Sequence, residues 1–154
     1  MIVVVDTNVL VWWVREVATP GQEDLIQRAR WLFEAMATED TELMITSITL
    51  AEFLAGAEPT QRSGLRREVE TAFIVQPFDA RAAERSAELW HLGRTLDHDD
   101  GRRPILKADV LIVASSRAGG AQRRSSHDAG LRSLAAKAGL DARDLPTSGP
   151  YLFS

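Results

Sequence analysis

The chain of 154 residues contains no cysteine. This absence excludes a disulfide framework, zinc sites built on thiolates and a cysteine nucleophile, and it suits a reducing cytoplasm. No apolar run approaches the roughly 20 residues that a membrane-spanning helix needs. The apolar N-terminus also lacks the basic start and the small-residue cleavage site of a signal peptide. We therefore expect a cytoplasmic protein without a membrane span.

Several familiar catalytic motifs are missing as well. The sequence has no glycine-rich phosphate loop, no Gly-x-Ser-x-Gly and no His-Glu-x-x-His. The three histidines, His91, His98 and His127, lie too far apart for a local metal-binding motif. We expect them to face solvent or to make local hydrogen bonds, in preference to binding zinc.

An excess of positive charge is missing too. Lys and Arg number 18 against 22 Asp and Glu, so the formal net charge is −4 and no overall positive field indicates a nucleic-acid partner. The charge is unevenly placed, however. Residues 1–60 contain ten acids and three bases, whereas residues 61–154 contain twelve acids and fifteen bases.

The sequence does contain strand patterns that alternate with helical patterns. This alternation predicts one α/β domain over residues 1–154, with a parallel sheet covered by helices on both faces. Strands are expected at 2–5, 43–46, 73–75 and, on a poor sequence, 121–126. Helices are expected at 9–14, 22–36, 48–57, 61–72, 80–96, 110–118 and 129–138. An irregular tail follows at 146–154.

Four carboxylates stand where sites form in such sheets, beyond the carboxyl ends of the strands. Asp6 follows the first strand directly, and Asp109 and Asp128 each begin or precede a helix. Glu52 is the only charge in a helix, 48–57, that is apolar on nearly every face. Such a helix is usually buried, and an isolated buried carboxylate is costly unless a cation lies near it.

Structural roles compete with a catalytic one for these residues. Asp6, Asp109 and Asp128 are each suited to cap a helix, and Glu52 suits a pocket rim or an ion pair. Capping does not account for Glu52, and it does not exclude metal binding. If the four acids converge, their mutual repulsion requires a cation, and all-oxygen ligation favours Mg²⁺ or Mn²⁺. Such an ion supports phosphate chemistry.

Three segments containing acids resemble, in order, those of PIN-domain ribonucleases, most closely VapC-like toxins of bacterial toxin–antitoxin pairs. They read VVVDTNVLVWW, ITSITLAEFLAG and ILKADVLIVASS. The resemblance implies a PIN-like α/β/α sandwich with a central parallel sheet. It also implies a Mg²⁺- or Mn²⁺-dependent endoribonuclease that leaves 5′-phosphate and 3′-hydroxyl ends. Asp6, Glu52 and Asp109 would ligate the metal, Thr7 would support the site through its hydroxyl, and Asn8 would order the turn.

The fourth acid of the family usually follows an apolar strand that ends in Thr-x-Asp. The matching stretch here is AQRRSSHD, which makes Asp128 the best counterpart although two arginines replace apolar residues. Three explanations stay open: an exposed, charged edge strand, a shifted alignment, or a site with three acids. Asp97, Asp99 and Asp100 are less favoured substitutes.

RNA binding requires positive charge close to the site. We expect this charge from Arg102, Arg103 and Lys107 beside the third acidic segment, and from Arg123 and Arg124 before the fourth acid. The alternative is that these bases only keep the surface soluble. By resemblance, the partners are a cognate antitoxin, whose helix docks into a groove and blocks the site, and a second copy of the chain.

Two other functions stay open. One is a PIN-fold protein that binds RNA or a partner but has lost its nuclease activity, which the altered AQRRSSHD segment favours. The other is a phosphohydrolase of small phosphate esters, although Asp-Thr-Asn lacks the second acid expected two residues after the first.

Trp12 and Trp13 are adjacent, so we expect at least one of them to face a partner.

Overall fold

The computed structural model describes residues 1–94 and 107–150, in which helices and strands alternate. The strands are β1 (Ile2–Val5), β2 (Glu42–Thr46), β3 (Ile74–Gln76), β4 (Arg123–Ser125) and β5 (Asp141–Arg143). The helices are α1 (Thr7–Leu10), continued by the π-helical turn η1 (Val11–Arg15), α2 (Asp24–Thr38), α3 (Ser47–Ala55), α4 (Arg62–Ala72), α5 (Ala80–Arg94), α6 (Ala108–Ala118) and α7 (Ala129–Lys137). None of these helices combines the length and apolar character needed to cross a membrane.

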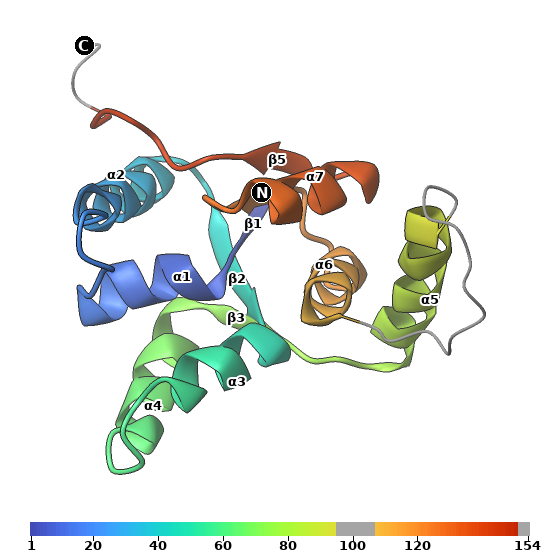
Figure 1. Ribbon diagram of the computed structural model, residues 1–154, viewed down its shortest axis with the longest axis horizontal. Helices are drawn as coiled ribbons and strands as arrows, with labels where there is room; N and C mark the ends of the chain where they lie inside the picture. Colours follow the sequence, from blue (N-terminus) through green and yellow to red (C-terminus); the bar gives the residue numbers. More distant parts are fainter. Residues whose placement is uncertain (95–106, 151–154) are drawn as a thin grey trace.

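The five strands form one sheet in the order β3-β2-β1-β4-β5, and every neighbouring pair is parallel. Helices lie on both sides of the strands, which confirms the predicted three-layer α/β/α architecture (Figure 1). The chain runs from β1 to β2 and β3 on one side and returns to β4 and β5 on the other. Ligands of open parallel sheets bind beyond the carboxyl ends of the strands at such a change of direction.

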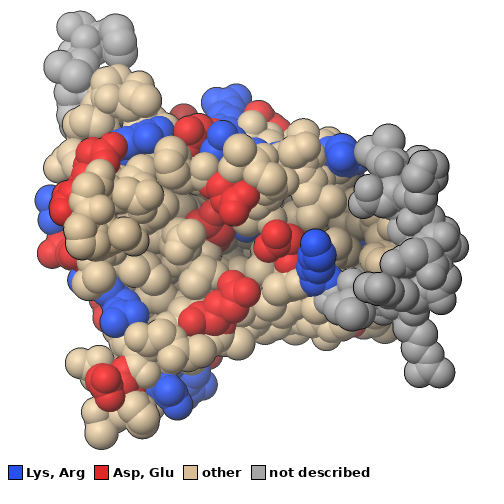
Figure 2. Space-filling model, in the orientation of Figure 1, with Lys and Arg blue, Asp and Glu red and all other residues tan. Residues whose placement is uncertain are grey.

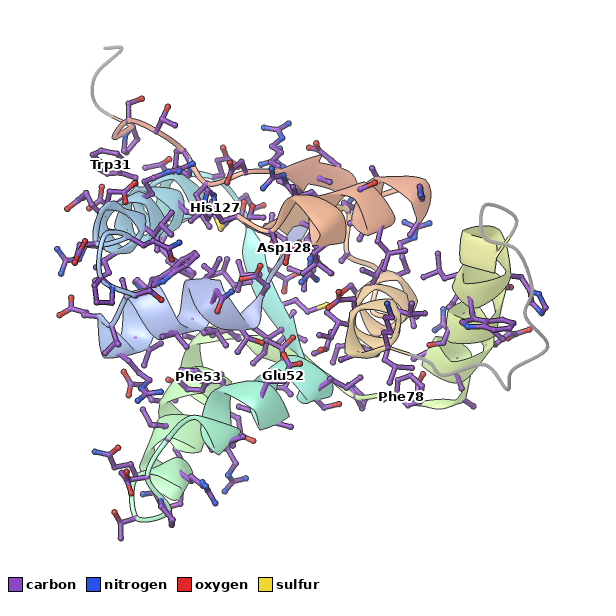
Figure 3. All side chains as sticks on the ribbon, in the orientation of Figure 1. Trp31, Glu52, Phe53, Phe78, His127 and Asp128 are labelled. Carbon is purple, nitrogen blue, oxygen red and sulfur yellow. The ribbon has the colours of Figure 1, made fainter. Side chains whose placement is uncertain are left out.

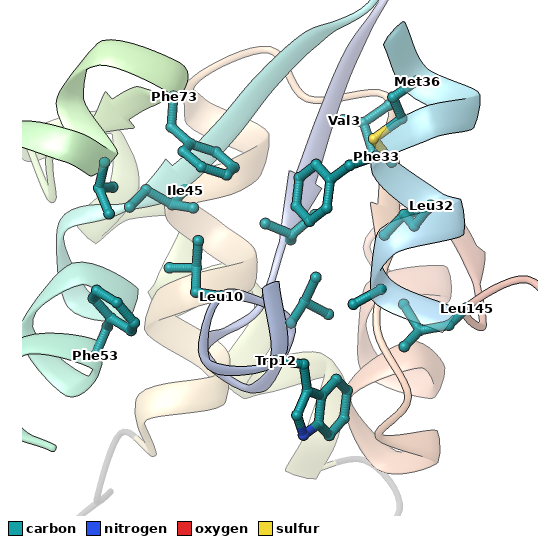
Figure 4. Close-up of a cluster of buried hydrophobic side chains, with 14 of the residues drawn as sticks. Val3, Leu10, Trp12, Leu32, Phe33, Met36, Ile45, Phe53, Phe73 and Leu145 are labelled. Atoms are coloured by element: carbon teal, nitrogen blue, oxygen red, sulfur yellow. The ribbon is translucent and has the colours of Figure 1, made fainter. Parts of the chain in front are cut away.

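One face of the sheet packs against α1, η1, α2, α3 and α4. Val3, Val5 and Ile45 supply the strand side chains of this cluster, and Figure 4 shows the aromatic and aliphatic residues that cover them. Burying a side chain of this size contributes about 1.5–3 kcal/mol. These contacts hold the segment that carries Asp6 and Thr7.

Both Trp12 and Trp13 pack in this apolar cluster, Trp12 within it and Trp13 partly buried against it, and a contact of Trp13 with a partner stays a prediction. Trp12 is buried, and the ring of Trp13 stacks on Phe33 with 4.1 Å between ring centroids. The segment α1–η1 packs against α2 and α3. Because helices flank it, the two tryptophan rings both reach apolar neighbours although they point in different directions.

The other face packs against α5, α6 and α7. Val4 and Met44 project from the sheet onto Val113 and Ala114 of α6 and onto residues of α7. Helix α5 buries Ala82, Ser86 and Leu89 against this face. Leu96, with which the predicted helix ends, lies outside the described residues.

The two C-terminal strands differ from expectation. β4 forms at Arg123–Ser125 despite its poor sequence, and it lies between β1 and β5. The proposed exposed, charged edge is therefore wrong. β5 was not expected, because Asp141–Arg143 has neither an apolar pattern nor β-branched residues. Backbone pairing with β4 compensates for this weak local preference.

Candidate metal centre

A pocket of about 260 Å³ opens where β1, β2 and β4 end. Its lining consists of Asp6, Thr7, Asn8, Glu52, Asp109, Ile112, Asp128 and Leu131. All four acids singled out from the sequence line this pocket, together with the two residues that follow Asp6. Figure 2 shows acidic side chains gathered around the centre of this face of the molecule.

Asp6 is the most buried of the four acids, with 6% of its surface exposed. Its Oδ1 accepts a hydrogen bond of 3.0 Å from the backbone N–H of Val9 and thereby caps α1. Its Oδ2 accepts a hydrogen bond from the hydroxyl of Ser126. Asp6 therefore caps a helix, as the structural alternative predicted, and also faces the pocket.

Glu52 is exposed, so the expectation of a buried carboxylate is wrong. Helix α3 buries only Thr49 and Phe53, and its remaining apolar residues lie at or near the surface. The hydroxyl of Thr7 donates a hydrogen bond of 2.6 Å to Oε2 of Glu52. The contact holds the carboxylate beside the segment that carries Asp6, in line with the supporting role expected for Thr7.

The start of α3 places Glu52 at the pocket. Thr46, the last residue of β2, caps the helix by accepting a hydrogen bond of 3.1 Å from the backbone N–H of Thr49. The strand therefore passes directly into the helix, and Glu52 lies within two turns of the carboxyl end of β2.

Asp109 lies exposed in the first turn of α6. The N-cap residue of this helix is Lys107, and no side-chain cap bond is formed among the described residues, so the capping alternative is wrong for Asp109. Its carboxylate lies near the positive end of the helix dipole, which stabilises negative charge. Lys107, one of the bases expected near the site, is exposed beside it.

Asp128 caps α7, since its Oδ1 accepts a hydrogen bond of 2.8 Å from the backbone N–H of Leu131. Ser126 connects it to Asp6: the Ser126 hydroxyl accepts a hydrogen bond of 3.1 Å from the backbone N–H of Asp128 and donates to Asp6. Figure 3 shows Asp128 at the start of α7 and Glu52 on α3, on opposite sides of the central region. Sequence reasoning gave Ser126 no role, although it stands two residues before Asp128, where the family pattern has threonine.

The structure corrects the expected position of two arginines near the pocket. Arg124 is fully buried and Arg123 pairs with Asp141 at 3.0 Å, near the start of β4, so neither lines the approach to the pocket. Arg102 and Arg103 lie outside the described residues, as do the substitute acids Asp97, Asp99 and Asp100.

The buried guanidinium of Arg124 lies within electrostatic reach of the site. Burial lowers the pKa of Arg124, and the charges of Asp6, Asp109, Asp128 and Glu52 act in the opposite direction. Arginine keeps its proton in proteins because its ordinary pKa lies far above neutral pH. A buried charge of this kind costs several kcal/mol unless other charges compensate it.

The donor atoms of the pocket fit a hard divalent cation. The four carboxylates and the Thr7 hydroxyl are all oxygen donors, the type that Mg²⁺ and Mn²⁺ prefer. A volume of about 260 Å³ also leaves room for several water molecules of roughly 30 Å³ each, and Mg²⁺ usually keeps part of its hydration. Within the described residues, no three acidic or histidine side chains stand ready to hold one ion together. Binding therefore requires water bridges or movement of exposed acids such as Glu52 and Asp109.

The described histidines fit local roles. The Nδ1 of His127 lies 2.9 Å from Oδ1 of Asp144, which also contacts the guanidinium groups of Arg28 and Arg132 at 3.5 Å. His91 is exposed beside Trp90. His98 lies outside the described residues.

Comparison with known proteins identifies a family. The PIN domain family model matches residues 3–137. No curated protein gives a significant match. Similar solved structures include VapBC2 from Rickettsia felis bound to a DNA fragment from its promoter, with 17% identity, a TM-score of 0.69, and coverage of 95% of this chain and 100% of the matched chain.

Two further structures are similar. FitAB bound to an IR36 DNA fragment has 19% identity and a TM-score of 0.63, over 92% of this chain and 94% of the matched chain. VapBC-1 from nontypeable Haemophilus influenzae has 17% identity and a TM-score of 0.65, over 94% of this chain and 98% of the matched chain. At these identities the likeness concerns the fold.

Proposed function

We propose that this chain, which belongs to the PIN-domain family, is a Mg²⁺- or Mn²⁺-dependent endoribonuclease. PIN domains are generally nucleases, and the choice of RNA and of these ions is our inference. The observation that carries it is the convergence of Asp6, Glu52, Asp109 and Asp128 from four separate segments onto one pocket. Four carboxylates gathered in one place repel one another, and a divalent cation relieves that repulsion.

Each acid contributes differently to the proposed site. Asp6, Glu52 and Asp109 would hold the metal, with Asp128 as the fourth acid. A bound ion would lower the pKa of a water molecule and stabilise the charge that develops on the phosphodiester. Thr7 orients Glu52, Ser126 fixes both Asp6 and Asp128, and Asn8 lies exposed at the rim beside them. Arg102, Arg103 and Lys107 would attract the RNA backbone.

We further propose that the protein is the toxin of a toxin–antitoxin pair in the cytoplasm. Two of the similar structures carry the name VapBC, and the three acidic segments of the sequence resemble those of VapC-like toxins. By this analogy the chain forms a homodimer, and a cognate antitoxin protein covers the pocket.

The proposal is tested by RNA cleavage with Mg²⁺ or Mn²⁺, with EDTA as the first control. We expect Asp6→Asn to lower the cleavage rate by roughly 100-fold or more, because the amide keeps the cap but loses the charge that binds metal. The matched variant is Asp79→Asn. Asp79 caps α5, since its Oδ1 accepts a hydrogen bond of 2.9 Å from the backbone N–H of Ala82, but it does not line the pocket. Unchanged cleavage by Asp6→Asn would refute the assignment.

The same experiments separate the two other functions. A PIN-fold protein without nuclease activity would bind RNA but show no cleavage that depends on the ion, and Mn²⁺ would not raise its melting temperature. A phosphohydrolase of small esters would hydrolyse a generic phosphate ester in preference to RNA. We expect cleavage of RNA over the ester, together with a rise in melting temperature on addition of Mn²⁺.

A further inference from the structure

Arg124 is the most unusual buried residue of the described chain. Its exposed fraction is 0%, and it is the largest of the fully buried side chains. Its Nε, Nη1 and Nη2 atoms have no hydrogen-bond partner among the described residues. Buried polar groups are normally paired, so an arginine left without a partner calls for a physical explanation.

The register of the sheet fixes the face on which Arg124 lies. Arg124 is opposite Val4 of β1 and Ala142 of β5, and Val4 packs with side chains of α6 and α7. Neighbouring residues opposite each other in a sheet project to the same face. The guanidinium therefore lies in the layer covered by α6 and α7, the helices whose first residues place Asp109 and Asp128 at the pocket.

Direct contact with a substrate does not account for this placement. The three nitrogen atoms are inaccessible to solvent, and Arg124 is not part of the pocket lining. It forms no ion pair with Asp6, Glu52, Asp109 or Asp128, yet all four act on it electrostatically. Charges separated by low-dielectric protein interact over several ångströms much more strongly than they do across water.

We propose that Arg124 is a built-in cation beneath the four-acid pocket, which balances part of the carboxylate charge and limits how strongly the pocket binds divalent ions. The claim that Arg124 limits the affinity for divalent ions rests on the metal binding of the proposed function. One divalent ion together with one guanidinium offsets most of the charge of four carboxylates, whereas two ions with the guanidinium would exceed it. The arrangement therefore favours occupancy by a single ion.

The first test measures divalent-ion affinity by calorimetric titration with Mn²⁺. We expect Arg124→Met to bind Mn²⁺ about tenfold more tightly than the native chain, or to take up a second ion, because a repelling charge has gone. Arg124→Gln is a second neutral variant in case the methionine variant does not fold, and Arg124→Lys keeps the charge and should retain native affinity. Arg123→Met is the matched control, since the neighbouring arginine is paired with Asp141.

The second test needs no metal. In EDTA, urea unfolding of Arg124→Met, Asp109→Asn and the double variant forms a double-mutant cycle. In the native chain, Asp109→Asn relieves repulsion among the acids but also loses the attraction between Asp109 and Arg124. In the Arg124→Met chain only the repulsion is relieved. We therefore expect Asp109→Asn to raise the folding equilibrium constant at least fivefold more in the Arg124→Met chain than in the native chain. A purely packing role for Arg124 would give additive effects.

The two tests separate the failure of this proposal from the failure of the proposed function. Coupling in EDTA together with no Mn²⁺ binding by any variant would refute the metal centre, while the guanidinium would still balance the acids. Mn²⁺ binding of equal strength in native, Arg124→Met and Arg124→Gln chains, with additive effects in EDTA, would overturn the role of Arg124 and leave the metal centre intact.

Discussion

At the scale of single residues, Thr7 offers a test of the proposed metal centre through a side chain that need not touch the ion. Its hydroxyl donates a hydrogen bond of 2.6 Å to Oε2 of the exposed Glu52. We expect Thr7→Val to weaken Mn²⁺ binding and slow RNA cleavage by roughly 10- to 100-fold, the usual effect of losing a group that orients a ligand. Titration with Mn²⁺ and initial cleavage rates measure both effects.

The matched variant for this prediction is Thr7→Ser, which keeps the hydroxyl and removes only a methyl group. It should restore most of the affinity and rate lost in Thr7→Val. If Thr7→Val bound Mn²⁺ and cleaved RNA as the native chain does, the hydrogen bond would have no part in positioning Glu52. Equal losses in both variants would instead indicate a packing defect.

The residues that line the pocket were largely predictable because their positions follow from the strands. Asp6 directly follows a β-branched run, and a parallel sheet brings the residues after its strands together. The exposure of Glu52 and the burial of Arg124 were not predictable from local patterns. The first depends on where α3 lies against its neighbours, and the second depends on which strands flank β4.

At the scale of the elements, α6 ends in a turn that requires a glycine. The backbone N–H of Ala121 bonds to the carbonyl of Ser116 and that of Gly120 to Arg117, with Gly120 at φ +81°. This is a Schellman ending, in which glycine adopts a left-handed conformation. We expect Gly120→Ala to lower the free energy of unfolding by about 1–2 kcal/mol, as measured by urea denaturation.

A second glycine-to-alanine change provides the control for this prediction. Gly64 lies exposed in α4, and a Cβ there would meet no atom within 4 Å. Gly64→Ala should raise the free energy of unfolding by about 0.5 kcal/mol, because alanine favours the helix. Two identical chemical changes should therefore shift stability in opposite directions. A stabilising Gly120→Ala would contradict the turn geometry.

Most elements were predictable because their apolar spacing or their ending glycines are local features. The pattern at 110–118 ends at two glycines, and α6 ends there. β4 was expected only on a poor sequence and β5 was missed, because these short strands lack an apolar pattern and form through pairing with β1 and with each other. The two arginines of β4 make a strand look unfavourable from the sequence, and only the structure shows that Arg124 is buried and that Arg123 pairs with Asp141.

At the scale of the whole molecule, a net charge of −4 is a poor guide to RNA binding. Four of the acids line one pocket, and one base, Arg124, lies beneath it out of reach of any substrate. We expect the triple variant of Arg102, Arg103 and Lys107 to alanine, in an Asp6→Asn background, to bind RNA more weakly. The slope of log affinity against log salt should become shallower by about 2, since three phosphate contacts are lost.

The control removes the same amount of charge from a different place. Arg85, Arg117 and Lys137 line a second pocket of about 130 Å³, and the last two lie in the final turns of α6 and α7. An eleven-residue helix such as α6 spans about 16 Å, so Arg117 near its end is far from Asp109 at its start, and the other two bases line the same pocket as Arg117. Their triple alanine variant lowers the net charge equally and should leave the salt slope nearly unchanged. Equal losses of affinity in both triple variants would mean that RNA responds to the total charge of the molecule and not to its placement.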